Sequence, residues 1–370
     1  MEKEYGCTMK KKNQAGFSLL EMIVAISLFV IVTGSVYALL ELGRSDRSRS
    51  SRRGDTQKNA RVAMYLLGRD VMNAGLGYHK TGGLVPDDFL TARLGVPTEV
   101  GSTRDTLTSV SCGNNVFTNR ELATNQKTDA IAFIYRDLDY NNGKTIVVTD
   151  EVGTGSATQV VLQTNATDFA SVNNNDLFLA ETKTSQIVGI VTSKDAATNR
   201  IIVDSIDNLG LNQARNLNDG NGNYIGSLLR KCTSLSDTNC TTYTGGIVLK
   251  KIEMVSYQIS SNGTFIRSVY GNNKDLAASD QIQQRAIAYG VKDFQIRYQL
   301  IDGTIVDDPV VGVDGIRGTA DDIQTNMNNV RYVSVVLTVS STEVDEKTGV
   351  AEEITLNSSF SLRNMGYDDK

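Results

Sequence analysis

The sequence predicts an α+β protein in which one long N-terminal helix precedes a large, mainly antiparallel β-sheet domain. Three observations support this fold class. The nineteen residues Met22–Leu40 carry no charge and are long enough for a membrane-spanning helix. Apolar residues then recur at helical spacing as far as about Ala74. Beyond residue 80 the chain consists of short apolar or alternating runs between polar turns, which is typical of antiparallel strands.

The composition narrows the function mainly by exclusion. The chain has 370 residues and a formal net charge of −5, so its overall charge does not point to a polyanionic partner. It contains one histidine, His79, and no G-x-S-x-G, Walker A or H-E-x-x-H motif. We therefore expect no catalytic site, no required cofactor and no specific nucleic-acid partner.

Glu21 stands directly before the uncharged run. As a helix, Met22–Leu40 would rise about 28 Å, close to the thickness of the hydrocarbon core of a bilayer. An ionised carboxylate in such a helix costs about 2.5–3.5 kcal/mol. Glu21 therefore needs a cationic partner or a special use.

The segment Gly16-Phe17-Ser18-Leu19-Leu20-Glu21-Met22 and the apolar run after it resemble the type III signal sequence of type IV prepilins. The resemblance implies that a prepilin peptidase cuts between Gly16 and Phe17 and that Phe17 is then N-methylated. It also implies that Glu21 pairs with the terminal amine of a neighbouring subunit during filament assembly. Two other interpretations are an ordinary signal anchor with an incidental Glu21 and a cleavable secretory signal. The second fits poorly, because Gly16 comes before the apolar run and not after it.

Basic residues flank the apolar run on both sides, so charge alone does not decide its orientation. The resemblance implies a cytoplasmic leader and an exported body. The protein would cross the bacterial inner membrane once, contacting lipid, and then reach the pilus or the cell surface. The arginine run that follows the span favours a solvated helix face near lipid phosphates over a dedicated binding site; its members are Arg44, Arg47, Arg49, Arg52 and Arg53.

The second half of the helix should pack on the body of the protein. Ala60, Met64, Leu67 and Val71 recur at i, i+4, i+7 and i+11, and glycines at 75 and 77 fit its end. We expect four parts: a cleaved leader (1–16), a transmembrane and assembly helix (17–42), a helix continuation packed on the head (43–75) and an exported β-rich domain (76–370).

The body contains eleven segments with strand character. They are Asp129–Tyr135, Thr145–Thr149, Gln159–Gln163, Asp176–Ala180, Ile187–Thr192, Arg200–Asp204, Ile247–Ile259, Thr264–Tyr270, Asp293–Leu300, Val330–Ser340 and Glu353–Leu362. In the ninth of them Phe294, Ile296 and Tyr298 alternate with polar residues, as a half-buried antiparallel strand requires.

Segments near both ends of the chain resemble the PilW family of large minor pilins. The segment Arg61–Tyr78 resembles the start of the family, whose helix ends in a run like Asp70–Gly75. Here Asn73 replaces an arginine, and two residues separate Gly75 from Tyr78. Ala288–Tyr298 and Val330–Ser340 resemble two of its strands, and Leu362-Arg363-Asn364 resembles its ending. Residues 85–240 remain mostly unmatched.

Of the four cysteines, Cys7 would leave with the leader. Cys232 and Cys240 lie in the exported part, where they predict a small disulfide loop worth about 2–3 kcal/mol. Cys112 is then either a buried thiol or a competitor for one of the other two.

Two acidic segments are candidates for structural calcium. Asp137, Asp139 and Asn141 have the spacing of the front half of a calcium loop, although a hairpin turn explains them equally well. The second segment is a glycine-rich loop that is either a calcium site or a solvated loop; its acidic residues are Asp307, Asp308, Asp314, Asp321 and Asp322.

Together the two resemblances imply a non-enzymatic minor type IV pilin that takes part in pilus assembly or priming, and the bulky head fits best at the tip. Twitching motility, adhesion or DNA uptake are the roles open to it. Its partners would be the prepilin peptidase, other major and minor pilins and the inner-membrane assembly platform. The alternatives are a minor pseudopilin of a type II secretion system and, in a different class, a membrane-anchored adhesin or ligand-binding protein.

Overall fold

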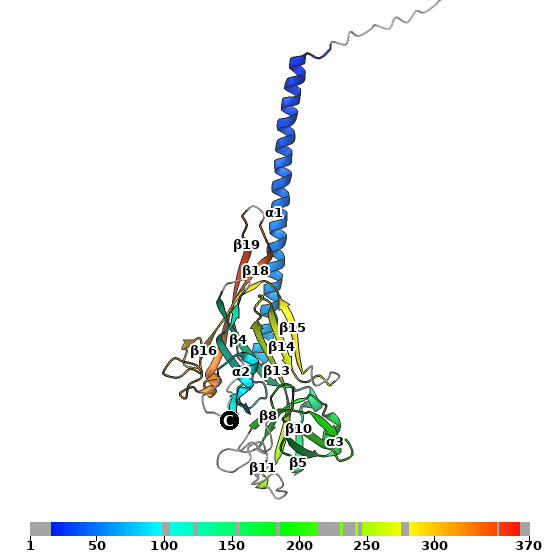
Figure 1. Ribbon diagram of the computed structural model, residues 1–370, viewed down its shortest axis with the longest axis vertical. Helices are drawn as coiled ribbons and strands as arrows, with labels where there is room; N and C mark the ends of the chain where they lie inside the picture. Colours follow the sequence, from blue (N-terminus) through cyan, green and yellow to red (C-terminus); the bar gives the residue numbers. More distant parts are fainter. Residues whose placement is uncertain are drawn as a thin grey trace, which may run out of the picture. The chain divides into compact units, whose positions relative to one another are not determined.

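The computed structural model describes residues 16–97, 104–120, 125–152, 156–182, 186–212, 230–231, 241–242, 246–274, 281–345 and 348–362. The chain forms two compact units, Met1–Gly54 and Asp55–Lys370. The first contains most of helix α1, and the second contains the remainder of α1 and all the strands (Figure 1).

The elements up to the middle of the chain are α1 (Leu19–Asn73), β1 (Gly83–Pro86), α2 (Asp88–Leu94), β2 (Arg104–Leu107), β3 (Val110–Asn119), β4 (Gln126–Arg136), η1 (Tyr140–Gly143), β5 (Ile146–Val152), β6 (Gln159–Thr164), α3 (Ala166–Ser171), β7 (Leu177–Glu181) and β8 (Gln186–Ile190). The later elements are β9 (Ser193–Asp195), β10 (Arg200–Asp204), β11 (Arg230–Lys231), β12 (Thr241–Thr242), β13 (Ile247–Ile259), β14 (Phe265–Tyr270), β15 (Ile282–Ala288), β16 (Val291–Leu300), β17 (Ile305–Val306), η4 (Gln324–Asn329), β18 (Val330–Val344) and β19 (Ala351–Ser361).

Helix α1 is a single helix of 55 residues, as the sequence predicts. It ends at Asn73, and the chain then turns through Gly75 and Gly77, whose φ angles are 79° and 62°. Glycine is favoured at such positions because it has no Cβ to clash in the left-handed region. The amide of Gly75 donates to the carbonyl of Ile134 on β4 (2.8 Å), so the helix end is hydrogen-bonded directly to the sheet.

The last five turns of α1 bury one face in the largest core of the second unit. Ala60, Met64, Leu67 and Val71 are all buried there, together with aromatic residues of the strands. The predicted i, i+4, i+7, i+11 stripe is thereby confirmed. Gly68 lies in the same stripe and lets the helix approach the ring of Phe360 on β19.

Strand β13 is the central strand of the β domain. Its first residues pair with β5 and β7, and its remainder, from Ile252, pairs with β4 and β14. Through these ladders it joins a 13-stranded sheet. A second sheet contains four strands in the order β17-β16-β18-β19.

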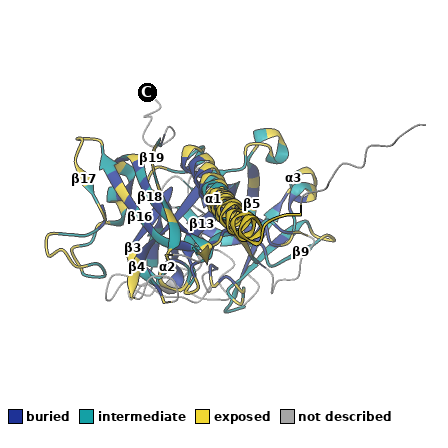
Figure 2. Cartoon of the chain, turned by 90° about the horizontal axis from the view of Figure 1, so that it is seen from above, coloured by how far each residue is buried: buried dark blue, intermediate teal, exposed yellow. Residues whose placement is uncertain are grey.

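Strand β4 and the later part of β13 are buried on both faces. Phe133 and Tyr257 point into the core beneath α1, whereas Ile134 and Met254 point into a second core that includes residues of α2. Figure 2 shows the buried residues concentrated along these strands. The sequence of β4 is therefore an apolar run without alternation, as expected for a strand covered on both sides.

All eleven predicted strand segments form strands, with boundaries shifted by a few residues at most, and the fold class is confirmed. The structure adds two longer strands that the sequence pattern did not reveal, β3 and β15. Polar residues interrupt both: Gly113-Asn114-Asn115 forms a bulge in β3, and Gln283-Gln284-Arg285 occupies β15. The single described parallel contact joins β1 to β8 through Leu84 and Ile187.

Candidate processing and assembly site

The peptide bond between Gly16 and Phe17 lies outside the helix. Residues 16–18 are irregular, and α1 begins at Leu19. A Cβ added to Gly16 would meet no heavy atom within 4 Å, and the side chain of Phe17 is 85% exposed. A protease therefore has access to this bond without unwinding helix.

Ser18 and Glu21 form a capping box at the start of α1. The hydroxyl of Ser18 accepts a hydrogen bond from the amide of Leu20 (3.3 Å), and the carboxylate of Glu21 accepts one from the amide of Ser18 (3.2 Å). Each side chain thus satisfies a backbone N–H that has no partner in the first turn. This role of Glu21 was not among the sequence-based predictions, although the S-x-x-E spacing before an apolar run is its known signature.

The capping box fixes where the carboxylate of Glu21 lies. Its oxygen is bound to the N–H of Ser18, one residue from the nitrogen of Phe17. The negative charge also stands in the first turn, where the helix dipole favours an anion. Glu21 is thereby held facing the place where cleavage would create a new amino terminus.

The helix that follows is built for an apolar surrounding. It contains a segment of mean hydropathy 2.5 of which no part is buried within the protein. The hydroxyls of Ser27 and Ser35 donate to the carbonyls of Ile23 (2.7 Å) and Ile31 (2.8 Å) in the preceding turn. Because both donors are satisfied within the helix, neither serine adds an unpaired donor to a lipid-facing surface.

The other end of α1 is fixed to the sheet by Asp70, whose side chain is fully buried. Its Oδ2 accepts hydrogen bonds from the hydroxyl of Tyr257 (2.6 Å) and from Nε of Arg267 (2.8 Å), while Oδ1 accepts from Arg69 (3.0 Å). Burial, reinforced by the charge of Asp70, raises the pKa of Tyr257, which keeps this hydroxyl a donor. The network therefore sets the position of the helix on β13 and β14.

Residues 11–37 match the family model of the prokaryotic N-terminal methylation motif, which is typical of type IV pilins and pseudopilins. The chain is type IV pilin-like. No curated protein and no solved structure matches it.

The motif implies that a prepilin peptidase processes this pilin-like chain and that it assembles with other pilins. The apolar helix and the motif together indicate a bacterial protein that is anchored in the membrane before it enters a pilus. Pilin-like proteins are typically structural subunits without enzymatic activity.

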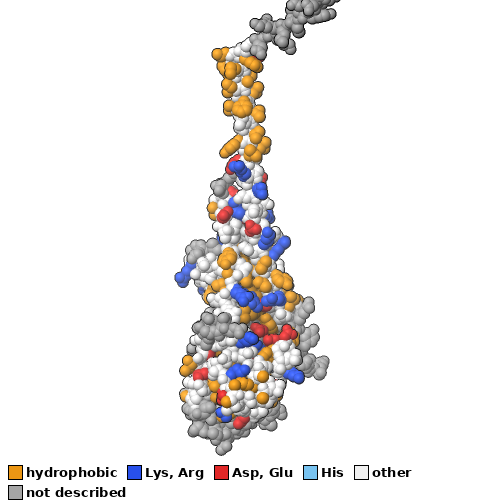
Figure 3. Space-filling model, turned by 90° about the vertical axis from the view of Figure 1, so that its right-hand side faces the viewer, with side chains coloured by type: hydrophobic (Ala, Val, Ile, Leu, Met, Phe, Trp, Pro, Cys, Tyr) orange, Lys and Arg blue, Asp and Glu red, His pale blue; other side chains and the backbone are white. Residues whose placement is uncertain are grey.

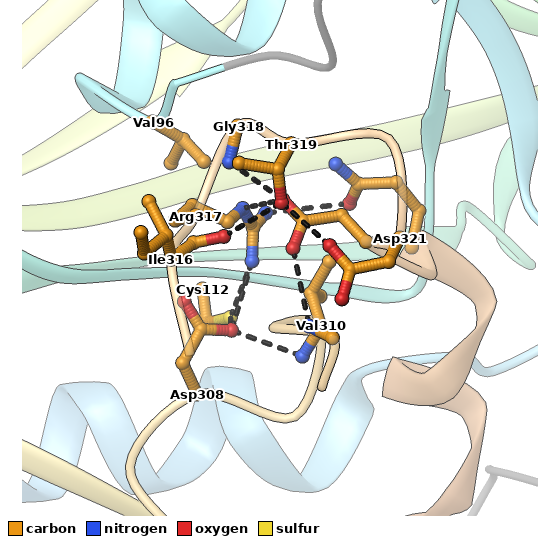
Figure 4. A network of polar contacts seen from close by, with 12 residues as sticks. Val96, Cys112, Asp308, Val310, Ile316, Arg317, Gly318, Thr319 and Asp321 are labelled. Atoms are coloured by element: carbon orange, nitrogen blue, oxygen red, sulfur yellow. Dashed lines mark hydrogen bonds and ion pairs between the residues drawn. The ribbon is translucent and has the colours of Figure 1, made fainter. Parts of the chain in front are cut away.

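The acidic residues of the loop after β17 are engaged mainly by one arginine and by backbone amides. Arg317 bonds to Asp308 (2.8 Å) and lies 3.8 Å from Asp322, and all three side chains are nearly buried (Figure 4). Asp321 and Asp314 bond within the loop, and Asp307 pairs with Arg297 on β16 (3.2 Å).

Arg317 thus offsets part of the acidic charge of this loop, a role for which the sequence pattern suggested calcium. Within the described residues, no group of three or more acidic, cysteine or histidine side chains is arranged to hold a metal ion. Calcium binding in this loop stays a prediction.

The other acidic segment forms a turn between β4 and β5. Asp137 accepts hydrogen bonds from the amides of Asp139 and Tyr140 (3.1 Å each), and Asn141 adopts a left-handed conformation (φ 49°). These hydrogen bonds stabilise the turn from within the chain, in agreement with the hairpin turn that was the alternative to a calcium loop.

Cys112 is a buried free thiol on β3 that donates to Asp308 (3.2 Å). Burial and the neighbouring carboxylate raise its pKa well above the ordinary value, so the thiol stays protonated. Cys232, Cys240, Arg363 and Asn364 lie outside the described residues.

Proposed function

We propose that this protein is a minor type IV pilin of the PilW kind that takes part in pilus assembly or priming at the filament tip. The observation that carries the proposal concerns the two PilW-like segments of the head. Ala288–Tyr298 and Val330–Ser340 fall largely on β16 and β18, which are direct antiparallel neighbours with Phe294 opposite Leu337. Segments that resemble one family and also pair in space form a common structural unit.

The end of α1 supports the same assignment. The third PilW-like segment, Asp70–Gly75, contains the buried carboxylate that fixes the helix to the head and the glycine that ends it. A large head also fits a low-copy position at a tip, because bulky heads pack poorly along a tight shaft.

Maturation would proceed by cleavage after Gly16 and methylation of Phe17. The new amine would lie beside the carboxylate that the capping box holds at Glu21. Within a filament the same carboxylate would pair with the amine of the neighbouring subunit and so set the axial register. An opposite charge at this depth offsets the cost of an ionised carboxylate in an apolar environment.

Two structural proposals accompany this function. Cys232 and Cys240 would form a disulfide. In support, the described residues that flank the segment between them, Lys231 and Thr241, pair with each other between β11 and β12. Non-reducing peptide mapping would find the two linked.

The loop at Asp314 and Asp321 would bind calcium. Adding calcium should raise the melting temperature of the protein, and the double variant Asp314→Ala with Asp321→Ala should abolish this increase.

The deciding experiment is fractionation of wild-type cells, a peptidase-null strain and a strain that lacks this protein. We expect the mature chain to begin at Phe17 by intact mass in wild type and to keep residues 1–16 without the peptidase. Loss of the protein should abolish or sharply reduce sheared surface pili. Normal piliation with loss of secreted exoproteins would instead identify a pseudopilin. Removal of the leader without the peptidase would reject both assignments.

A further inference from the structure

Five arginines follow the apolar part of α1 within ten residues. We call Arg44, Arg47, Arg49, Arg52 and Arg53 the arginine collar. The longer stretch from Glu41 to Asp55 contains three acidic residues, Glu41, Asp46 and Asp55, and therefore has a net charge of +2. Figure 3 shows blue side chains gathered on the helix directly after its orange apolar segment.

The collar begins at the depth of lipid phosphates. In a continuous helix, Arg44 and Arg47 lie about 6 and 10 Å beyond Leu40, the last residue of the uncharged run. The headgroup layer on each side of a bilayer is about 5–7 Å thick. The remaining three arginines follow over about 10 Å of helix, roughly one Debye length in physiological salt.

The collar surrounds the helix and does not form a single stripe. At about 100° per residue, Arg47 lies some 60° from Arg44, whereas Arg49 and Arg53 lie on the opposite side. Arg44, Arg47, Arg49 and Arg53 are exposed. Arg52 is half-buried and donates to the hydroxyl of Ser48 one turn earlier (2.8 Å). A charge distribution of this kind fits a planar anionic layer crossed by the helix.

All five basic residues are arginine, and none is lysine. A guanidinium presents five N–H donors in a planar fork and binds a phosphate through two parallel hydrogen bonds. It can keep a contact to its own helix and still bind a phosphate. The exclusive use of arginine therefore points to phosphate groups, because a general need for positive charge could also be met by lysine.

We propose that the arginine collar binds the phosphate groups of lipid headgroups at the outer face of the inner membrane. Arg44, whose Cα lies in the headgroup layer, and Arg47, whose long side chain can reach back to it, make the direct contacts. The other three attract anionic headgroups by their charge. The collar thus holds the subunit at a fixed depth until it leaves the bilayer. The side of the membrane rests on the proposed function, whereas phosphate binding itself does not.

The test uses the full chain in nanodiscs of phosphatidylcholine with a minor fraction of phosphatidylglycerol. After extraction into mild detergent at low salt, the lipids that remain bound are counted by mass spectrometry. We expect phosphatidylglycerol to be enriched about fivefold over its bulk fraction in wild type, and the enrichment to vanish near 0.5 M salt, where screening is within about 4–5 Å. Arg44→Gln with Arg47→Gln should remove most of it, and the matched Arg→Lys pair should keep part.

The control is Lys58→Gln with Arg61→Gln, which removes the same charge from the same helix further from the apolar run. Equal enrichment in this control and in the Arg44/Arg47 variant would overturn the proposal, as would no enrichment in wild type. A short DNA duplex that binds through the collar while lipid shows no preference would also overturn it and would assign the collar to nucleic acid. Leader processing is measured separately, so a failure of the proposed function leaves this outcome interpretable.

Discussion

Glu21 has two roles that meet at one carboxylate. It completes the capping box with Ser18, and it holds a negative charge next to the site where the mature amino terminus would form. The first role can be filled by any hydrogen-bond acceptor of the same shape. The second depends on charge, so a substitution that keeps the shape separates the two.

We predict that Glu21→Gln leaves membrane insertion and leader cleavage intact but lowers recruitment into filaments. Glutamine at this position still accepts the hydrogen bond of a capping box. It cannot pair ionically with an amine. The ratio of sheared-filament to membrane-bound protein, compared with wild type, measures the effect. Equal ratios would show that Glu21 is not an assembly contact.

Asp70 is the residue on which the docking of α1 depends. Its buried carboxylate neutralises Arg267, a side chain that is itself largely buried. We predict that Asp70→Asn lowers the free energy of unfolding by about 3–5 kcal/mol, because the change leaves a buried guanidinium without its counter-charge. Thermal and denaturant unfolding of the detergent-solubilised chain would measure this.

Asp55→Asn is the matched control, since Asp55 lies on the same helix and its side chain is 71% exposed beside Lys58. It should change stability by less than about 0.5 kcal/mol. Combining Asp70→Asn with Arg267→Gln should cost less than the sum of the two single changes. Additive losses would mean that the two groups do not interact.

The contact between α1 and β19 decides whether a substitution in the helix stabilises or destabilises the protein. A Cβ at Gly68 would lie 2.3 Å from Cε1 of Phe360. Helix propensity alone would make Gly68→Ala stabilising by about 1 kcal/mol. Overpacking against the ring costs about 1–3 kcal/mol, so we predict net destabilisation.

Gly54 on the same helix is the control position, because a Cβ added there would meet no heavy atom within 4 Å. Gly54→Ala should therefore be neutral or slightly stabilising. The second change Phe360→Leu should recover part of the loss caused by Gly68→Ala. Melting temperatures of the single and double variants give the comparison. If Gly68→Ala raised the melting temperature, the close contact between α1 and β19 would be contradicted.

Asp129 joins the 13-stranded and the four-stranded sheets. From β4 it accepts hydrogen bonds from the amide of Asn115 (2.8 Å) and, across the junction, from the amide of Ile296 on β16 (2.6 Å). Burial raises the pKa of Asp129 to about 6, although these two hydrogen bonds act to lower it. The charges of Asp293 and Asp307 also raise the pKa.

A carboxyl whose pKa is higher in the folded state stabilises the fold most when it is protonated in both states. Its contribution is fully present below the unfolded value near 3.8 and is lost as the pH rises through about 6. We predict that wild type loses stability relative to Asp129→Asn between pH 4 and 7. Melting curves over this range would test it, with the exposed Asp302→Asn as a control that should stay flat above pH 5. A difference independent of pH would contradict the prediction.

Features whose residues lie close together along the chain could be predicted before the fold was known. The Gly16–Glu21 motif and the Met22–Leu40 span can be recognised locally, and the buried stripe of α1 follows from a spacing of three and four residues. The alternation in β16 likewise predicted which of its side chains are buried. In the stripe and in β16 the signal has the period of a helix or a strand, and the motif and the span are read from contiguous residues.

Contacts between groups far apart along the chain could not be predicted from local patterns. Asp70 finds Tyr257 and Arg267 at separations of 187 and 197 residues, and Arg317 reaches Asp308 and Asp322 only because the loop folds back on itself. The pairing of β13 with four different strands was equally hidden, because an apolar run does not indicate its partners. Such contacts form because folding buries charged groups and strand edges away from water, where each of them needs a partner. Which partner lies within reach depends on how all the elements pack together.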